Sequence, residues 1–433
     1  MSSEPKIFHG EWWVPAEADP NNQGLFPMIH KGMEAKHTGT LKYYEDNVSI
    51  LEFYHVPSDF NAKLYWKNNV MWGADANGFI YTLFNVTKRP GINKAGFTAT
   101  VFEVDLILLG EHVLSLKEAK YDRCVVKYPY LRNWAFRDHL ISNTTDNRWV
   151  QTIIDASKYT TILEAQMDNG FKWVLYDKFV LNRSIFDLNL IQSTEFKICA
   201  NEAVSIESLL KNANEFSRFL SVALYGEQNP TEIDFYRKGQ SRSTKLLFKI
   251  DRSIDPKLNK LIKFDELKEK VPAMLVIWHQ NYDKIAPISS YLVDSLRKKN
   301  EFDVPDFLIV AQALDGYHKR FVNKKDGKDI QKYEEQIRVL LNQFKDVNVI
   351  QECNIDPEVL KDTRHKYSHL YPNDEKSKAV EGEELYWLTE KCKILLTCCI
   401  LNMLGLSNDE INLCCNNNTI KRMLGYHPFT FDE

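Results

Sequence analysis

The hydrophobic pattern of this chain differs in period between its N-terminal and C-terminal parts, and that difference limits the folds that the chain can adopt. Over about the first 200 residues, short runs of β-branched and aromatic residues alternate with Asn, Gly and Asp, which is typical of strands and turns. From about Phe264 onward, apolar residues recur at the three- and four-residue spacing of helices. The sequence therefore predicts an α+β protein, with a β-rich N-terminal domain followed by an all-α helical bundle.

The N-terminal part carries several runs that are typical of strands. The clearest of them are Thr38–Tyr44, Val48–Tyr54, Phe79–Val86 and Thr98–Leu109. Strands of this length and spacing predict a sandwich or an open-barrel-like sheet, and the choice between the two stays open. Trp12 and Trp13 precede these runs and are interpreted as core residues rather than as platforms for stacked bases.

A helical stripe interrupts the β-rich part at residues 205–225. Two further strand-like runs, Glu232–Tyr236 and Lys245–Ile250, follow this stripe, and we assign them to the same part of the chain. The sequence therefore predicts two domains, a β-rich domain over residues 1–262 and a helical domain over residues 263–433.

The C-terminal part is predicted to be almost entirely helical. Three of its helices are expected to begin at a proline, where the missing N–H costs little, and Asp356 before Pro357 makes a good N-cap. The expected helices are Asp265–Gln280, Pro287–Lys299, Pro305–Val322, Lys328–Phe344, Pro357–His369, Val380–Leu404 and Asn408–Asn416.

Composition and spacing exclude several classes of protein. The net charge of −4 argues against uniform coating of nucleic acid, although a local basic groove stays open. None of the eight cysteines forms a C-x-x-C pair, and no phosphate-binding, dinucleotide-binding or H-E-x-x-H motif occurs. No apolar run reaches the ~18 residues of a membrane-spanning helix. We therefore expect a cytoplasmic protein that uses no membrane, no cofactor and no metal.

One segment combines residues suited to RNA cleavage. Four residues separate Arg364 from His369, and the polar His365 follows the arginine directly. Histidine changes its charge near neutral pH and can act as base or acid, while arginine stays charged and binds phosphate oxygens through two N–H groups. His365 and Tyr367 are further candidates for orienting a substrate.

The same loose spacing occurs twice more in the chain, so spacing alone does not identify a site. Arg132–His139 lies in an aromatic stretch of the β-rich part, and Arg422–His427 lies beside glycine and proline near the last residues. The pair Arg364 and His369 lies in a predicted helix. On an ideal helix these two residues project ~140° apart with a rise of ~7.5 Å. They can converge if the helix unwinds at His369, or if two copies meet at a two-fold axis.

The segment resembles the signature of HEPN ribonucleases, in which a polar residue follows an arginine and a histidine comes four to six residues later. The segment 383–404 resembles the long last helix of ApeA-like HEPN domains, and Phe307–Tyr317 resembles the helix that packs against it. The segments Phe8–Trp13 and Leu109–His112 are similar to the N-terminal domain of ApeA-like anti-phage proteins. His365 stands where this family most often has Asn, which leaves its role open.

The resemblance implies a function. HEPN ribonucleases act as dimers without a metal and leave a 2′,3′-cyclic phosphate and a 5′-hydroxyl. Arg364 and His369 would be the catalytic residues, and RNA and a second copy of this chain would be the partners. The resemblance also implies a toxin of abortive infection in anti-phage defence, answering a phage-derived trigger. The N-terminal domain would sense that trigger or restrain the nuclease.

Basic residues near the motif are candidates for holding the RNA backbone, although an ordinary solvated loop is the commoner explanation of such a run. These candidates are Lys319, Arg320, Lys324, Lys325 and Lys366.

Two interpretations stay open beside the nuclease. The bundle could be a HEPN fold that binds RNA or protein, or that dimerises, without cleaving. Asp315 and His318 could reach the site from a neighbouring helix, but packing or surface polarity is the safer interpretation of both.

Overall fold

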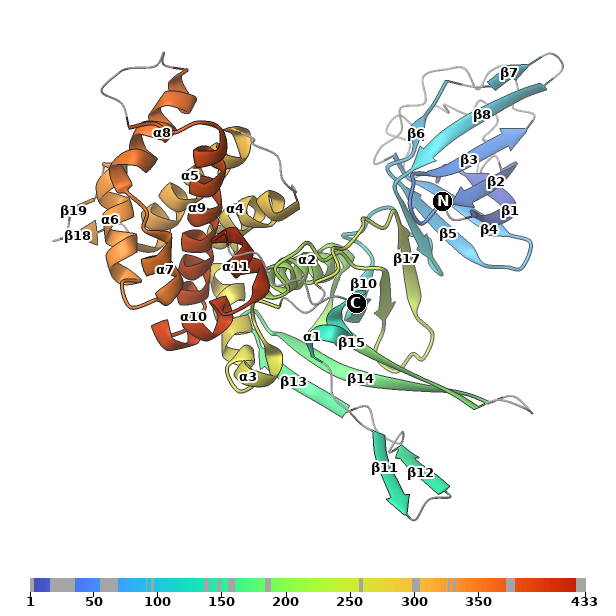
Figure 1. Cartoon of the computed structure of the whole chain (residues 1–433). Coiled ribbons are helices and arrows are strands. Elements are labelled where there is room, and N and C mark those ends of the chain that lie inside the picture. The colour runs from blue at the N-terminus through green and yellow to red at the C-terminus, as the bar shows by residue number, and fades with distance from the viewer. Residues whose placement is uncertain are drawn as a thin grey trace. The chain divides into compact units, whose positions relative to one another are not determined.

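The computed structural model consists of two compact units (Figure 1). Unit 1 comprises Met1–Pro129, Asp138–Asn214 and Asn229–Arg252, and unit 2 comprises Tyr130–Arg137, Glu215–Gln228 and Ser253–Glu433. Compactness does not define where an independently folding domain ends, so the predicted boundary after residue 262 stays a prediction. The structure describes residues 4–15, 36–54, 69–90, 92–94, 97–135, 140–145, 149–154, 160–183, 188–256, 260–297, 304–322, 324–325, 328–329, 332–370 and 378–425.

Unit 1 is built on one antiparallel sheet of 15 strands, which confirms the predicted β-rich domain. Its pairing order is β13 (Thr160–Gln166), β14 (Phe171–Arg183), β15 (Leu188–Ser205), β10 (Lys120–Lys127), β16 (Glu232–Tyr236), β17 (Thr244–Phe248), β9 (Leu106–Leu109), β5 (Ile80–Phe84), β4 (Met71–Asp75), β1 (Lys6–Trp13), β2 (His37–Tyr43), β3 (Ser49–Tyr54), β8 (Phe97–Val104) and β6 (Thr87–Lys88), with β7 (Ile92–Lys94) paired to β8. A separate hairpin joins β11 (Leu140–Thr145) to β12 (Trp149–Ile154).

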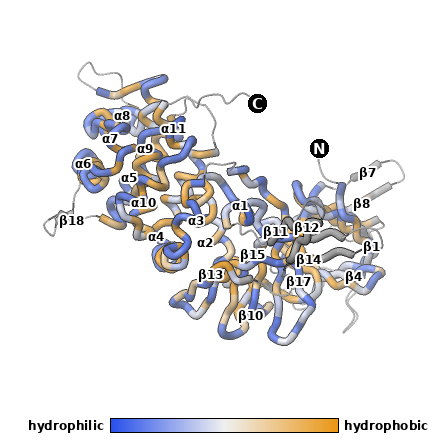
Figure 2. Tube along the Cα trace, turned by 60° about the horizontal axis from the view of Figure 1, so that its bottom comes forward, coloured by the Kyte–Doolittle hydropathy of each residue, from blue (hydrophilic) through white to orange (hydrophobic). Residues whose placement is uncertain are grey.

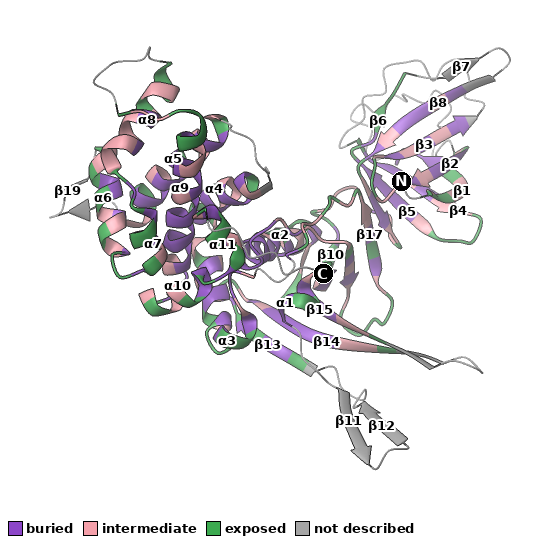
Figure 3. Cartoon of the chain, viewed as in Figure 1, coloured by how far each residue is buried: buried purple, intermediate pink, exposed green. Residues whose placement is uncertain are grey.

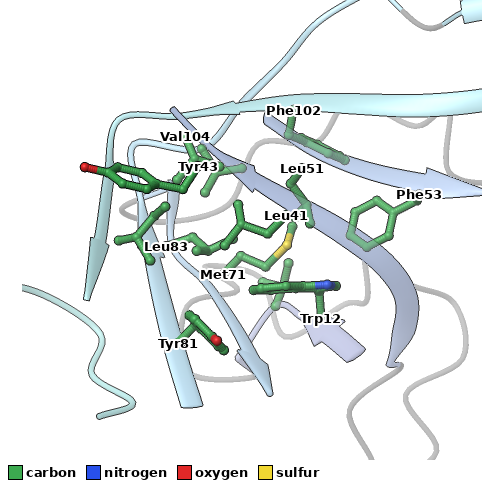
Figure 4. Close-up of a cluster of buried hydrophobic side chains, with 13 residues drawn as sticks. Trp12, Leu41, Tyr43, Leu51, Phe53, Met71, Tyr81, Leu83, Phe102 and Val104 are labelled. Atoms are coloured by element: carbon green, nitrogen blue, oxygen red, sulfur yellow. The ribbon is translucent and has the colours of Figure 1, made fainter. Parts of the chain in front are cut away.

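Part of this sheet curls around a core. Only Asp105 separates β8 from β9 in the chain, yet these strands stand at the two ends of the run β9-β5-β4-β1-β2-β3-β8. A run whose end strands are consecutive in the chain has to bend back on itself, which favours the open-barrel alternative. The core residues inside the curl include Trp12, Leu41, Leu51, Leu83 and Phe102 (Figure 4).

Glycine is required at one point of this core. Trp12 is fully buried on β1, and its ring lies against Gly73 of the paired strand β4. A Cβ atom at Gly73 would overlap the indole ring, so any larger residue displaces the tryptophan. The expectation that Trp12 and Trp13 are core residues is confirmed, since both are buried.

The two strand-like runs near residue 240 form β16 and β17 in the main sheet, as expected. The helix expected between residues 205 and 225 is α2 (Ile206–Ala223). The run Thr98–Leu109, expected as one strand, forms two strands, because the chain turns at Asp105 and β9 pairs with β5 and β17 instead of β3.

Unit 2 is a helical bundle whose helices carry hydrophobic and hydrophilic stretches (Figure 2). Its elements are α1 (Leu131–Trp134), α3 (Phe264–Leu267), α4 (Val271–Arg297), α5 (Val304–Tyr317), a π-helical turn (His318–Val322), the short hairpin of β18 (Lys324–Lys325) and β19 (Lys328–Asp329), α6 (Tyr333–Gln343), α7 (Asn348–Cys353), α8 (Pro357–His369), α9 (Gly382–Met403), α10 (Asn408–Cys415) and α11 (Asn418–Met423). The second half of α2 belongs to this unit.

One predicted helix boundary is wrong. Pro287 was expected to begin a new helix, but α4 continues through it from Val271 to Arg297. Proline inside a helix costs about 3 kcal/mol, because it removes one hydrogen bond and crowds the preceding turn. Ile285 and Ile288, on either side of the proline, are buried, and α4 packs on α5 and α9. This burial offsets the cost.

A second boundary is also wrong. The helix predicted to begin at Lys328 begins at Tyr333, because β19 occupies Lys328–Asp329. The short helices α1, α7 and α11 were not predicted and have four to six residues, and the helix predicted over Asp265–Gln280 is divided into the four-residue α3 and the first part of α4. Such short elements carry too few residues to show a period.

Helix α9 forms the centre of the bundle and is largely buried (Figure 3). Its Lys393 is buried as well, and its ammonium group lies 2.9 Å from a carboxylate oxygen of Asp306 and 2.7 Å from one of Glu390. Burial alone would lower the pKa of Lys393, but the two carboxylates outweigh it and raise the pKa above its ordinary value. This charge cluster fixes α9 against the first turn of α5.

The cysteines of α9 and α10 lie in the core. Cys398, Cys399, Cys414 and Cys415 are unbonded and buried, as small apolar residues of the core. In the part of the chain that the structure describes, no helix combines the length and apolar character needed to cross a bilayer.

Candidate active site

Helix α8 has the bounds that the sequence predicts. The side chain of Asp356 accepts a hydrogen bond of 2.8 Å from the backbone N–H of Glu358, and Pro357 fills the first helical position. The helix ends at His369, because Leu370 adopts a left-handed conformation with φ 53° and donates its N–H to the carbonyl of Lys366. Both ends of the helix that carries the motif are therefore fixed by local capping.

The segment before α9 lies along one side of α8. Thr363 is fully buried, and its hydroxyl donates to the carbonyl of Val359 at 2.7 Å while accepting from the backbone N–H of Val380 at 3.1 Å. Tyr367, one turn later, donates its hydroxyl to the carbonyl of Val380 at 3.4 Å. These contacts leave the other sides of α8 to Arg364 and to the histidines.

Arg364 is held by residues of two other helices. Its Nη2 lies 3.2 Å from Oδ2 of Asp315 on α5, and its guanidinium lies 4.2 Å from the ring centre of Tyr333 on α6. An arginine over an aromatic face gains a cation–π attraction in addition to the ion pair. Arg364 retains 29% exposure against 13% for Asp315, so the guanidinium is fixed in place and still reachable.

Tyr333 itself is firmly anchored. Its hydroxyl donates to the carbonyl of Ala311 at 3.1 Å, and burial raises its pKa well above the ordinary value. The ring therefore stays neutral and presents its face to Arg364. Because α8 packs against both α5 and α6, these three helices together place the arginine.

His365 and His369 lie one turn apart at the C-terminal end of α8. Both side chains are exposed, and their ring centres lie 4.7 Å apart at an angle of 58°. His369 is the last helical residue, so α8 does not unwind before it. The expected separation of ~140° and ~7.5 Å from Arg364 therefore applies.

The remaining predicted site residues are engaged in other contacts. Lys366 forms an ion pair with Glu381, and its ammonium lies 5.7 Å from the ring centre of Tyr367. Tyr367 also packs edge-on against Phe307 of α5, and burial, followed by the charge of Glu381, raises its pKa. Tyr367 is therefore placed to support the helix.

Two of the predicted basic residues form hydrogen bonds within the helical unit. Lys319 donates to the same Oδ2 of Asp315 at 3.0 Å, and Arg320 donates to the carbonyl of Lys284 at 2.6 Å. The side chains of Lys324 and Lys325 lie outside the description, which covers only their backbone in β18.

For each of the two competing motifs, the structure describes the arginine but not the histidine. Arg132 is exposed on the four-residue helix α1, and Arg422 is exposed on α11, with its Nη2 3.5 Å from the hydroxyl of Thr419. Their histidines, His139 and His427, lie outside the described residues.

From the sequence, the role of Asp315 stayed open, and no motif or spacing pointed to Tyr333. The contact between Arg364 and Asp315 joins residues 49 positions apart, so it depends on how α5 packs on α8. His318, the other open candidate, is fully buried, and neither ring nitrogen has a hydrogen-bond partner among the described residues. Burial lowers its pKa, so His318 is a neutral core residue of the π-helical turn.

The class of protein is defined by the helical bundle together with two family models that match the chain, and it is the HEPN-type class. The family model of the Apea-like HEPN domain matches residues 308–410, which include Asp315, Tyr333 and all of α8. The model of ApeA N-terminal domain 1 matches residues 7–278. The chain therefore belongs to the ApeA-like HEPN proteins. No curated protein and no solved structure matches it.

Family membership points to anti-phage defence, and the HEPN domain points to a nuclease. Within the described residues, no three His, Cys, Asp or Glu side chains lie close enough together to hold a metal ion.

Proposed function

We propose that this protein is an RNA endonuclease of anti-phage defence, in which Arg364 and His369 carry the chemistry without a metal. The observation that supports this most directly is the fixed but reachable guanidinium of Arg364. A positive charge that needs no rearrangement before reaction stabilises a transition state most effectively. HEPN membership supports RNA as the class of substrate.

The proposed reaction is a transfer within the RNA chain. A histidine accepts the proton of the 2′-hydroxyl, whose oxygen attacks the neighbouring phosphorus. The bond from phosphorus to the 5′-oxygen breaks, and a protonated histidine gives that oxygen its proton. The products are a 2′,3′-cyclic phosphate and a 5′-hydroxyl, and Arg364 stabilises the negative charge that develops on the phosphoryl oxygens.

We infer that the working site is formed by two copies of the chain. Arg364 and His369 project apart on a helix that stays regular through His369, so one copy cannot easily bring both to one phosphate. A two-fold axis beside α8 would place the arginine of one copy near the histidine of the other.

Cleavage of RNA in the presence of EDTA tests the proposal. Wild-type protein should leave fragments with a cyclic phosphate, and Arg364→Ala and His369→Ala should lower the rate by roughly 10²-fold or more. Arg422→Ala, which removes the arginine of a competing motif, is the matched control and should cleave like wild type.

Equal cleavage by all four proteins would contradict the proposed site. RNA binding without cleavage by any of them, also after Gly73→Val has removed the restraint proposed below, would favour the alternative, a HEPN module that binds RNA without cutting it.

The β-rich unit is proposed to restrain the nuclease until a phage-derived trigger arrives. Truncation is a poor test, because Glu215–Gln228 belongs to the helical unit. There, Nδ1 of His279 lies 2.6 Å from the carboxylate of Glu215, and the hydroxyl of Tyr225 lies 3.0 Å from that of Thr397. A fragment that begins at residue 263 would lose both contacts.

The restraint is better tested in the full chain. Gly73→Val displaces Trp12 and should disrupt the curled sheet, so growth of cells that express it should fall in the absence of phage. Ala76→Val, which introduces the same side chain in an exposed turn after β4, should behave like wild type. Normal growth with Gly73→Val, despite a shown loss of sheet structure, would argue against restraint by this unit.

A further inference from the structure

The pair His365 and His369 has the spacing of two histidine ligands on one helix. Four positions on a helix bring two side chains to one face, and the ring centres here lie 4.7 Å apart. Both rings are exposed, so an ion can reach them from solvent. The same i, i+4 spacing of two histidines on a helix holds zinc in H-E-x-x-H enzymes.

The charges nearest these rings in sequence do not oppose a cation between them. The two cations nearest in sequence are already paired, Lys366 with Glu381 and Arg364 with Asp315. The caps at Asp356 and Leu370 fix both ends of α8, so the histidines change little in backbone position when they bind an ion. Neutral imidazole is a preferred ligand of first-row divalent ions such as zinc and nickel.

We propose that His365 and His369 form a two-ligand site for a divalent transition-metal ion, and that the bound ion inhibits the nuclease. The inhibitory part rests on the proposed function. His369 needs a free lone pair to accept the 2′-hydroxyl proton, and a metal–nitrogen bond occupies a lone pair of the ring and fixes its orientation. Two protein ligands leave the remaining positions of a tetrahedral ion to water, so the site is open and reversible.

The role of His365 follows from this arrangement. The sequence leaves its function open, since the commonest residue at this place in HEPN signatures is Asn. As the second ligand it would make the end of α8 respond to metal without taking part in the reaction. Variants at His365 therefore separate the metal site from the chemistry of His369.

Equilibrium dialysis of the full-length protein against ZnCl₂, repeated with NiCl₂, tests the site. Wild type should bind one ion more per chain than His365→Gln or His369→Gln, and affinity should fall by at least roughly tenfold when one ligand is lost. His9→Gln is the control, because His9 is an exposed histidine on β1 in the other unit, with Nδ1 3.0 Å from the hydroxyl of Thr40. Equal binding by wild type and both α8 variants, or no binding by wild type, would overturn the proposal.

Cleavage assays then separate this inference from the proposed function. Zinc should suppress RNA cleavage by wild type, and His365→Gln should keep whatever activity it shows in EDTA when the same zinc is added. Metal binding that needs both histidines, without any nuclease activity in wild type or in the released variant Gly73→Val, would keep the site and reject the proposed function. Cleavage in EDTA by a wild type that binds no metal at α8 would keep the function and reject the site.

Discussion

At the scale of single residues, the arginine of the motif is defined by its partners. Asp315 holds the guanidinium by charge at 3.2 Å, and Tyr333 supports it from the face of its ring. Asp315 also competes with any phosphate for the same N–H groups. Its carboxylate therefore has two opposite effects, since it orients Arg364 and it repels the RNA backbone.

We expect the orienting effect to dominate the rate of reaction. Asp315→Asn should lower kcat for RNA cleavage by roughly 10- to 100-fold, because a loosely held arginine is out of place when charge develops. The KM for RNA should stay equal or fall, because one negative charge beside the phosphate is gone.

Steady-state kinetics on a short labelled RNA measures the two constants separately. Glu334→Gln is the control, because it removes a carboxylate of α6 whose partners are Arg338, at 2.7 Å, and Lys361 of α8, at 3.6 Å, and neither partner belongs to the proposed site. A variant Asp315→Asn with unchanged kcat and a raised KM would show that the carboxylate does not position Arg364.

At the scale of elements, capping residues and prolines predicted a helix boundary correctly where local interactions decide it, and wrongly where packing decides it. The bounds of α8 follow from Asp356 and Pro357, which act on their own turn, and the structure confirms them. The start expected at Pro287 is wrong, because burial of α4 against α5 and α9 outweighs a local preference. A proline shows where a helix can begin, whereas packing shows whether it does.

The residues of the candidate site show the same difference between local sequence signals and packing. Arg364 and His369 could be chosen from the sequence, since their chemistry and spacing are visible in a single helix. Tyr333 could not, because its position over Arg364 arises from the packing of α5, α6 and α8. The spacing of His365 and His369 could be read from the sequence. The structure adds that both lie at an exposed, capped helix end, which is what makes them candidates for binding an ion.

At the scale of the whole molecule, the order of the chain does not follow the division into units. Tyr130–Arg137 and Glu215–Gln228 belong to the helical unit although strands of the sheet precede and follow them. The N–H of the Trp134 indole donates to the carbonyl of Ile262 at 2.8 Å, and that of Trp278 donates to the carbonyl of Glu215 at 3.0 Å. Hydrophobic period identifies the two classes of structure but not these exchanges.

The proposed assembly of two chains gives a prediction that single variants cannot test. If each site combines Arg364 of one copy with His369 of the other, a mixed dimer of Arg364→Ala and His369→Ala retains one intact site of two. Random mixing makes about half of the dimers mixed, so co-expression of the two inactive variants should restore about a quarter of wild-type activity.

The measurement is RNA cleavage by co-expressed variants that carry different tags and are purified through both tags in turn. Purified mixed dimers should then reach about half of wild-type activity, because each has one working site. A site built within one chain predicts no recovery, since both kinds of chain lack one catalytic residue. A site that needs both arginines and both histidines also predicts none, so recovery would identify the composite site. Its absence in mixed dimers shown to form would reject it.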